Sequence, residues 1–278
     1  MSRNLVVRIA FAVVAIPAAI LIIYAGDWIL ASALAILGVL GTRELYDLGR
    51  KQGIAPIGWL GYLCAFAIPL GITSPYAIAW PFALAGWLMV VMAAALATRS
   101  PAAKPLPVVA LTVFGPLYAS WLPAFILMLR SRSALSPWAG TWLVLLPLIA
   151  TWICDTAAMA AGSAIGGPKL APVVSPNKTW AGAVGGLIGA VAATVAIGTW
   201  ILPRQGITAA PAALAVIGIA IGVLAQVGDV AESLFKREAG VKDSSSLIPG
   251  HGGILDRLDS LYFVLPATAG LFWFFHIP

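Results

Sequence analysis

Residues 180–202, WAGAVGGLIGAVAATVAIGTWIL, decide the fold class of this chain. The run carries no charged residue and is as long as the roughly 20 residues that an α-helix needs to cross a bilayer. A helix suits lipid because it satisfies its own backbone hydrogen bonds where no water can do so. The glycines of the run let a second helix approach closely. The stretch therefore predicts a membrane-spanning helix that packs against a neighbour.

Similar apolar runs occupy most of the chain, which is 61% hydrophobic and only 9% charged, with a mean hydropathy of +0.99. This composition indicates an integral membrane protein. We expect an all-α polytopic fold with about nine transmembrane helices, although the third run is short for a span. The runs are 6–25, 28–48, 57–72, 76–98, 106–129, 138–162, 180–202, 208–228 and 260–276.

The distribution of lysine and arginine predicts the topology. If the N-terminus is cytoplasmic, nine spans leave only Arg130, Arg132 and Arg204 on the far side, in agreement with the positive-inside rule. A basic start before an apolar run also fits a cleaved signal peptide, but the length of the run and the spans that follow favour a retained helix. The net charge of +6 forms no basic stripe interleaved with aromatic residues, so no nucleic-acid partner is expected. We expect a protein of a bacterial inner membrane.

Charge is concentrated in residues 233–260, SLFKREAGVKDSSSLIPGHGGILDRLDS. If a helix begins at Ile254, Asp256 and Asp259 lie on one of its faces, and Asp229 stands at the end of the preceding span. Three carboxylates at one membrane boundary predict a site for a hard cation, Mg²⁺ or Mn²⁺, with room for a second cation. The alternative is ion pairing of these acids with Lys236, Arg237 or Arg257.

The loop before these acids predicts an anion site. Its residues Pro249, Gly250, Gly252 and Gly253 can present backbone N–H groups just before a helix begins. Together with Lys236, Arg237 and Lys242, this loop indicates a place where metal and phosphate meet. His251 is either a hydrogen-bonded loop residue or a proton-transfer group.

A second polar stretch, SPNKTW at residues 175–180, comes just before the glycine-rich helix. Pro176 disfavours helix before it, and Thr179 can cap the helix that follows. Lys178 is then either a solvated cation at the helix end or a ligand for a phosphate. Asp155 is a further acid at the end of an apolar run.

Two features within the apolar runs have ordinary structural interpretations. Arg43, Glu44 and Asp47 fit a cytoplasmic helix end with ion pairs at spacings of three and four residues. Cys64 and Cys154 fit small packing residues, and no disulfide is expected.

Residues 233–260 resemble the signature of the phosphatidate cytidylyltransferases (CDP-diacylglycerol synthases): S-x-x-K-R, K-D, P-G-H-G-G and D-R-x-D. SPNKTWAG (175–182) is similar to the S-P-K-K-T-x-E-G of that family, and CDTAAMAAG (154–162) to its D-T-G-A-Y-x-x-G-R. The resemblance covers Asp155 to Ser260, and the first half only in hydropathy. This chain departs from the pattern at Ala157, Met159, Ser163, Asn177 and Ala181.

The resemblance implies an enzyme of phospholipid biosynthesis that joins CTP to phosphatidic acid, releasing pyrophosphate. It implies a cytoplasmic active site on residues 138–278, with residues 1–137 as a scaffold and as the candidate contact of a homodimer. Implied metal ligands are Asp229, Asp256 and Asp259, with Asp155 in support; implied catalytic residues are Lys236, Arg237, Lys242, Asp243, His251 and Arg257; implied phosphate contacts are Ser175, Lys178, Thr179, Ser233, Gly252 and Gly253.

Two other classes fit part of the pattern. A CTP-dependent kinase of polyprenol or dolichol would share the nucleotide and the membrane, but it needs a base for an alcohol, and His251 is the obvious candidate. A cation-coupled transporter would use Asp155 and Asp229, and it predicts broken helices near the middle of the membrane.

Overall fold

The computed structural model describes residues 3–132, 136–248 and 252–278, without the side chains of residues 3–12 and 77. Two short strands accompany the helices, so the fold is nearly all-α. The α-helices are α1 (Arg3–Ala25), α2 (Asp27–Lys51), α3 (Gly58–Thr73), α4 (Trp80–Thr98), α5 (Pro105–Pro116), α6 (Leu122–Ser131), α7 (Pro137–Ile165), α8 (Trp180–Ala196), α9 (Pro211–Glu238), α10 (Leu255–Leu258) and α11 (Leu261–Phe274). Short 3₁₀ or π turns are η1 (Ala77–Ala79), η2 (Pro101–Ala103), η3 (Leu117–Trp121), η4 (Ile197–Ile201) and η5 (Leu202–Gln205).

The expectation of a helical membrane protein is confirmed, whereas the count of about nine spans is not. Six stretches among the described residues are long and apolar enough to cross a membrane. Two further apolar helices, Val13–Ala25 and Gly58–Thr73, are shorter. The six stretches are Asp27–Lys51, Trp80–Thr98, Pro105–Ser131, Pro137–Ile165, Trp180–Gln205 and Pro211–Glu238.

The chain divides into two compact units. Unit 1 comprises Met1–Leu127 and Phe235–Leu258, and unit 2 comprises Met128–Leu234 and Asp259–Pro278. The predicted division at residue 137 stays a prediction about function. In the fold, part of the charged segment packs with the N-terminal helices, and the rest belongs to unit 2.

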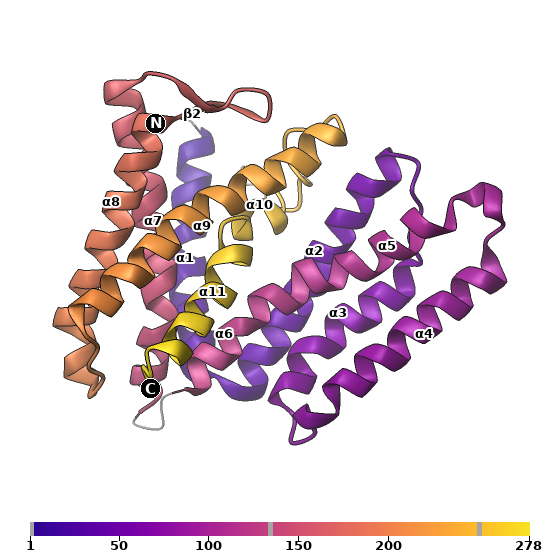
Figure 1. Cartoon of the computed structure of the whole chain (residues 1–278), viewed down its shortest axis with the longest axis horizontal. Coiled ribbons are helices and arrows are strands. Elements are labelled where there is room, and N and C mark those ends of the chain that lie inside the picture. The colour runs from indigo at the N-terminus through magenta and orange to yellow at the C-terminus, as the bar shows by residue number, and fades with distance from the viewer. Residues whose placement is uncertain (1–2, 133–135, 249–251) are drawn as a thin grey trace. The chain divides into compact units, whose positions relative to one another are not determined.

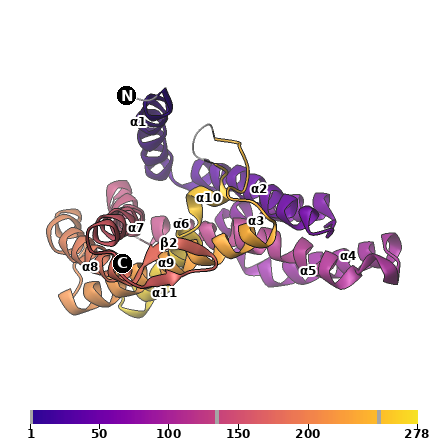
Figure 2. The ribbon, with the colours of Figure 1, turned by 90° about the horizontal axis from the view of Figure 1, so that it is seen from above.

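In unit 1, α2, α3, α4 and α5 lie side by side (Figures 1 and 2). Thr112 of α5 connects this helix with α2 and with the start of α3, since its carbonyl accepts from the Tyr46 hydroxyl at 2.7 Å and its hydroxyl accepts from the Ile57 N–H at 2.9 Å. Phe235 belongs to this unit, and its ring makes T-shaped contacts with the rings of Phe114 and Tyr118. Most of α4 is exposed and apolar, as suits a helix that faces lipid.

In unit 2, α7 and α8 run side by side (Figure 1) because small residues line their contact. A Cβ added to Gly189 would lie 2.8 Å from the Cβ of Ala157, and one added to Gly186 would lie 3.0 Å from the carbonyl oxygen of Cys154. The packing role predicted for these glycines is confirmed. Helix α9 approaches α8 in the same way at Gly218.

A short hairpin follows α7. Strand β1 (Lys169–Ala171) pairs antiparallel with β2 (Ser175–Thr179), in the register Lys169 with Thr179 and Ala171 with Ser175. Gly166 and Gly167, with φ of 69° and 96°, let the chain leave the helix. The hairpin places Lys178 and Thr179 immediately before α8.

Candidate active site

A polar cavity of about 390 Å³ lies in unit 2, among α7, the β1–β2 hairpin, α8 and α9. Asp155 comes from α7, Lys178 from β2, and Asp229 from α9. Residues separated by more than fifty positions in the sequence therefore line one space. The remaining lining residues are Ala158, Met159, Gly162, Ser163, Leu170, Asn177, Thr179, Gly182, Ala183 and Gln226.

Two residues that line this polar cavity form an ion pair. Lys178 Nζ lies 2.6 Å from Asp229 Oδ2, and the two side chains remain 24% and 32% exposed. The hydroxyl of Ser233, one turn further along α9, donates to Asp229 Oδ1 at 3.4 Å. Because both charges keep access to the cavity, a ligand can reach them without unfolding the site.

The start of α8 positions Lys178. Thr179 is the N-cap, and its buried hydroxyl accepts a hydrogen bond from the Gly182 N–H at 3.1 Å. This confirms the predicted cap. The helix dipole adds partial positive charge at this end, so the cavity favours an anion near Lys178.

Asp155 and Asp229 line the polar cavity, and a third acid of unit 2, Asp259, lies near them. Asp229 and Asp259 both lie within electrostatic range of Asp155. Asp229 does not end its helix as predicted, because α9 continues to Glu238. The apolar pattern stops at residue 228, yet a helix that leaves the membrane can continue with polar residues. Among the described residues, no three acidic, histidine or cysteine side chains form a ready-made metal cluster.

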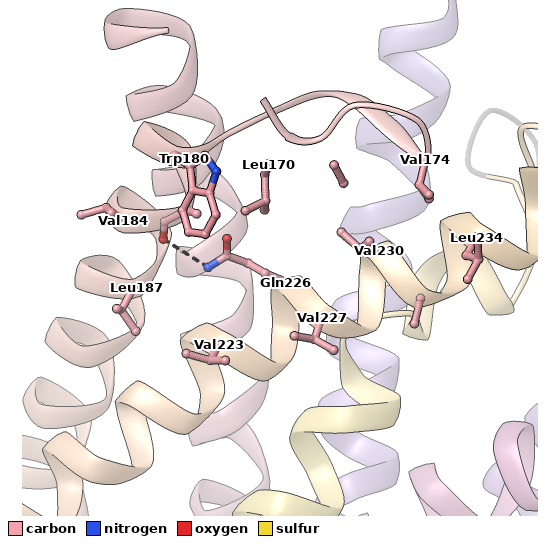
Figure 3. A pocket seen from close by; sticks show the side chains of 13 residues that line it. Leu170, Val174, Trp180, Val184, Leu187, Val223, Gln226, Val227, Val230 and Leu234 are labelled. Carbon is pink, nitrogen blue, oxygen red and sulfur yellow. Dashed lines mark hydrogen bonds between the residues drawn. The ribbon is translucent and has the colours of Figure 1, made fainter. Parts of the chain in front are cut away.

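A second cavity, apolar and of about 550 Å³, lies in the same unit, and Figure 3 shows the side chains that line it. Leu170, Ala183 and Gln226 line both cavities. Gln226 Nε2 donates to the carbonyls of Ala183 at 3.1 Å and Gly222 at 2.8 Å, which fixes this side chain at the boundary. The other apolar-cavity residues are Ala171, Val174, Trp180, Val184, Leu187, Val223, Val227, Val230, Ala231 and Leu234.

Unit 1 holds a different ion pair. Lys236 Nζ lies 2.7 Å from Asp256 Oδ1, and the side chains are only 10% and 6% exposed. Asp256 Oδ2 also accepts from the N–H groups of Ser244 and Gly253 and from the Ser244 hydroxyl. Burial alone would raise the pKa of Asp256, but the hydrogen bonds from Gly253, Lys236 and Ser244 hold it below the usual range of an aspartic acid.

Glu44 of α2 binds the same loop. Its carboxylate accepts hydrogen bonds from the hydroxyls of Ser244 and Ser245 and from the N–H groups of Ile254 and Leu255, at 2.7 to 3.0 Å. We call these five residues the Glu44 clasp. The predicted helix-end ion pairing is confirmed for Asp47, which pairs with Arg50, and is wrong for Glu44.

Two positions of the loop have no space for a side chain and are occupied by glycine. Gly252 has a φ of 78°, and a Cβ there would lie 2.5 Å from Asp256 Oδ2. A Cβ on Gly253 would collide with Ser244 Oγ and Glu44 Oε2. The glycines therefore let the backbone lie against two carboxylates. The Gly253 N–H already serves Asp256, and phosphate binding by Gly252 and Gly253 stays a prediction.

Comparison with known proteins identifies the family. A sequence model described as "Cytidylyltransferase family" matches residues 6–275. The chain belongs to the cytidylyltransferase family. A phosphatidate cytidylyltransferase of Synechocystis is 31% identical over 284 residues, 93% of each chain. One from Haemophilus influenzae is 46% identical over 142 residues, 50% of this chain and 48% of its own length. The chloroplastic phosphatidate cytidylyltransferase 4 of Arabidopsis thaliana is 35% identical over 272 residues, 87% of this chain and 66% of its own length.

The cytidylyltransferase motif residues are divided between the two units. Asp155, Lys178, Thr179 and Asp229 line the polar cavity, with Ser233 and Asp259 in the same unit. Lys236, Gly252, Gly253 and Asp256 come together in unit 1. Arg237, Lys242, Asp243 and Arg257 are exposed, and Ser175 lies on β2. His251 lies outside the described residues.

One local prediction about the cytidylyltransferase motif is wrong. The helix expected to carry both Asp256 and Asp259 ends at Leu258, and α11 begins only at Leu261. Asp259 Oδ1 accepts from the N–H of Ser260 in the intervening turn. Hydrogen bonding of an aspartate to the next backbone N–H competes with helix continuation there.

Sequence reasoning gave no functional role to four residues that the structure places beside motif residues or in the cavities: Glu44, Ser244, Ser245 and Gln226. A glutamate inside the long apolar run 28–48 is the one available signal for Glu44, because an acid there needs a partner. Its partners are about 200 positions away, so no local pattern could name them.

Proposed function

We propose that this protein transfers the cytidylyl group of CTP to phosphatidic acid, forming CDP-diacylglycerol and pyrophosphate in phospholipid biosynthesis. One observation carries the proposal: the polar cavity with Lys178 and Asp229 adjoins the apolar cavity within one unit. A phosphatidate has the same two parts, a phosphate and acyl chains. The relatives named as phosphatidate cytidylyltransferases support the same reaction.

The proposed chemistry needs no strong base. The phosphate oxygen of the lipid is already an anion at neutral pH, and it attacks the α-phosphorus of CTP. A bond forms from that oxygen to the α-phosphorus, and the bond from the α-phosphorus to the β-bridging oxygen breaks, so pyrophosphate leaves. The main barrier is repulsion between two anions, which Lys178 and the N-terminus of α8 reduce by fixed positive charge.

A magnesium or manganese ion fits the acidic residues of the polar cavity. Such an ion is commonly held by one or two carboxylates together with substrate phosphates, so a closed protein cluster is not required. Asp229 and Asp259 would hold it, with Asp155 in support, and the proposal includes a second cation. When bound, it would neutralise charge on the phosphates. Asp256 as a ligand stays a prediction, and its present hydrogen bonds favour an anchoring role.

The two ends of the substrate then occupy different cavities. In this proposal the phosphates bind near Lys178, and an acyl chain binds along Val223, Val227 and Val230, which line the apolar cavity (Figure 3). Gln226 stands at the boundary between them. Burying apolar surface favours the chain at roughly 25 cal/mol per Å².

Two isotopic labels test the reaction. Purified protein is incubated with phosphatidic acid and with CTP labelled on either the α- or the γ-phosphate. We expect the α-label in an organic-extractable lipid and the γ-label in pyrophosphate. A γ-label in the lipid with CDP in water would identify a lipid kinase instead and overturn the proposal. Absence of any transfer with both substrates present would also contradict it.

We also propose that the protein lies in a bacterial inner membrane with the charged loop in the cytoplasm, as the lysine and arginine distribution favours. The substitutions Leu247→Cys and Thr208→Cys, each in a background lacking Cys64 and Cys154, place one thiol at each of two exposed loop positions. An impermeant reagent should label them from opposite faces. Labelling from the same face would contradict the proposed topology. A homodimer through the N-terminal helices stays a prediction, which cross-linking in the membrane would test.

A further inference from the structure

We propose that Glu44 is a positioning residue for cytidylyl transfer: through the Glu44 clasp, its carboxylate fixes the loop that carries Asp256. The inference rests on the proposed function, because it assigns a role in that reaction. Glu44 belongs to the second apolar helix, far in sequence from every motif that marks the family.

The clasp closes the loop at both ends. Ser244 and Ser245 stand at one end of the loop, Ile254 and Leu255 stand at the other, and all four donate to one carboxylate. Glu44 is only 4% exposed. A buried carboxylate is costly unless donors surround it, so it favours the one loop conformation that supplies all four.

The clasp connects directly to the ion pair. The Ser244 hydroxyl lies 2.9 Å from Glu44 Oε2 and 2.8 Å from Asp256 Oδ2, and its single proton is shared between the two acids. Asp256 in turn holds Lys236. A displacement of the Glu44 carboxylate therefore changes the position of the Ser244 hydroxyl. Because this hydroxyl also binds Asp256, the change is passed on to Asp256 and to its partner Lys236.

The backbone leaves little freedom in this arrangement. Gly253 lies so close to Ser244 Oγ and Glu44 Oε2 that no side chain fits. The clasp thus sets the loop position by contact as well as by hydrogen bonds. A role confined to folding would change the amount of folded protein, whereas a positioning role changes turnover by the folded protein.

The first test compares Glu44→Gln with Asp47→Asn. The glutamine keeps the size of the side chain but presents one acceptor oxygen and an NH₂ group to four donors. We expect kcat to fall by about 10²-fold, the loss that a displacement of about 1 Å can cause, with the KM for CTP nearly unchanged. Asp47 lies one turn further along the same helix, is half exposed and pairs only locally, so Asp47→Asn should leave kcat unchanged. Normal kcat in folded Glu44→Gln protein would overturn the proposal.

A second measurement reports on the loop itself. Ile254 is only 7% exposed at the end of the loop, so Ile254→Cys in a background without the native cysteines gives a thiol that a reagent reaches only when the loop opens. Adding Glu44→Gln should raise the labelling rate by at least about tenfold, since roughly 1.4 kcal/mol of loop fixation corresponds to that factor. The melting temperature should fall by no more than a few degrees, as a loss of that size predicts for a chain of this length. An unchanged labelling rate would contradict loop fixation by Glu44.

A gentler pair of variants covers the case in which Glu44→Gln does not fold. Ser245→Ala removes one of the four donors, and Ser245→Thr keeps the hydroxyl. We expect Ser245→Ala to lower kcat by about threefold to tenfold, the value of one hydrogen bond, and Ser245→Thr to restore it. Equal kcat in wild type and both variants would overturn the proposal. If wild-type protein forms no CDP-diacylglycerol, the proposed function fails instead, so the two failures are distinguishable.

Discussion

The protein contains two lysine–aspartate pairs of nearly equal length in very different surroundings. Lys178 and Asp229 are 2.6 Å apart, line a cavity and keep a quarter to a third of their side-chain surface exposed. Lys236 and Asp256 are 2.7 Å apart, almost fully buried and surrounded by loop donors. The first pair is accessible to a ligand, whereas the second pair is enclosed and stabilises the conformation of the loop. The presence of a charged residue in the motif therefore does not show whether its side chain can bind a ligand or stabilises the loop.

The largest expected effect breaks the exposed pair. Asp229→Asn should lower turnover by about 10³-fold, because it removes the charge proposed to hold a metal at the reacting phosphates. Stability should change by less than about 1 kcal/mol, since the pair is partly exposed. CDP-diacylglycerol formation and thermal unfolding in detergent measure the two effects. Glu238→Gln, exposed on the same helix, is the control, and Asp229→Asn with activity within about tenfold of wild type would refute the assignment.

Breaking the buried pair should affect both properties. Asp256→Asn removes the carboxylate that pairs with the buried Lys236, which we expect to cost about 3–5 kcal/mol of stability and about 10²-fold in turnover. The double variant Lys236→Met/Asp256→Asn should recover most of the stability and none of the activity. Thermal melts and turnover of the three proteins separate the two effects. If Asp256→Asn is as stable as wild type, the buried pair does not differ from the exposed pair in its contribution to stability.

The pH dependence of stability sharpens the comparison. The pKa of Asp256 is lower in the folded protein than in the unfolded chain, so its ionised form stabilises the fold above about pH 4. That contribution is lost as the pH falls through the folded-state pKa. The stability difference between wild type and Asp256→Asn should therefore shrink as the pH is lowered from about 5 to about 3. A difference that stays constant over this range would contradict the assigned hydrogen bonds.

The smallest expected effect concerns the apolar cavity. Ala231→Phe should raise the KM for dioleoyl phosphatidate by about tenfold, because the added ring fills space proposed for an acyl chain. The KM values for dihexanoyl phosphatidate and for CTP should stay the same. Val216→Phe, an exposed position on the same helix outside the cavity, is the control. An equal rise for both lipids would place the acyl chain elsewhere.

The sequence predicted those structural features that depend only on neighbouring residues. The cap at Thr179 follows from its place before a glycine-rich apolar run, and the packing role of the α8 glycines follows from their small size. The β1–β2 hairpin was missed, because its strands are short and one contains a proline. The count of about nine spans is not confirmed, since apolar composition does not give the length of each helix and six stretches among the described residues are long and apolar enough to cross a membrane.

The sequence by itself determined a helical membrane protein of the cytidylyltransferase family, because long apolar runs must form helices in lipid and the polar motif is long and specific. The tertiary structure alone decided which charges meet. Asp229 pairs with Lys178 across a cavity, whereas Asp256 is enclosed with Lys236 beside the Glu44 clasp. Whether a carboxylate reacts or anchors depends on its burial and its donors, and these come from chain segments far apart in sequence.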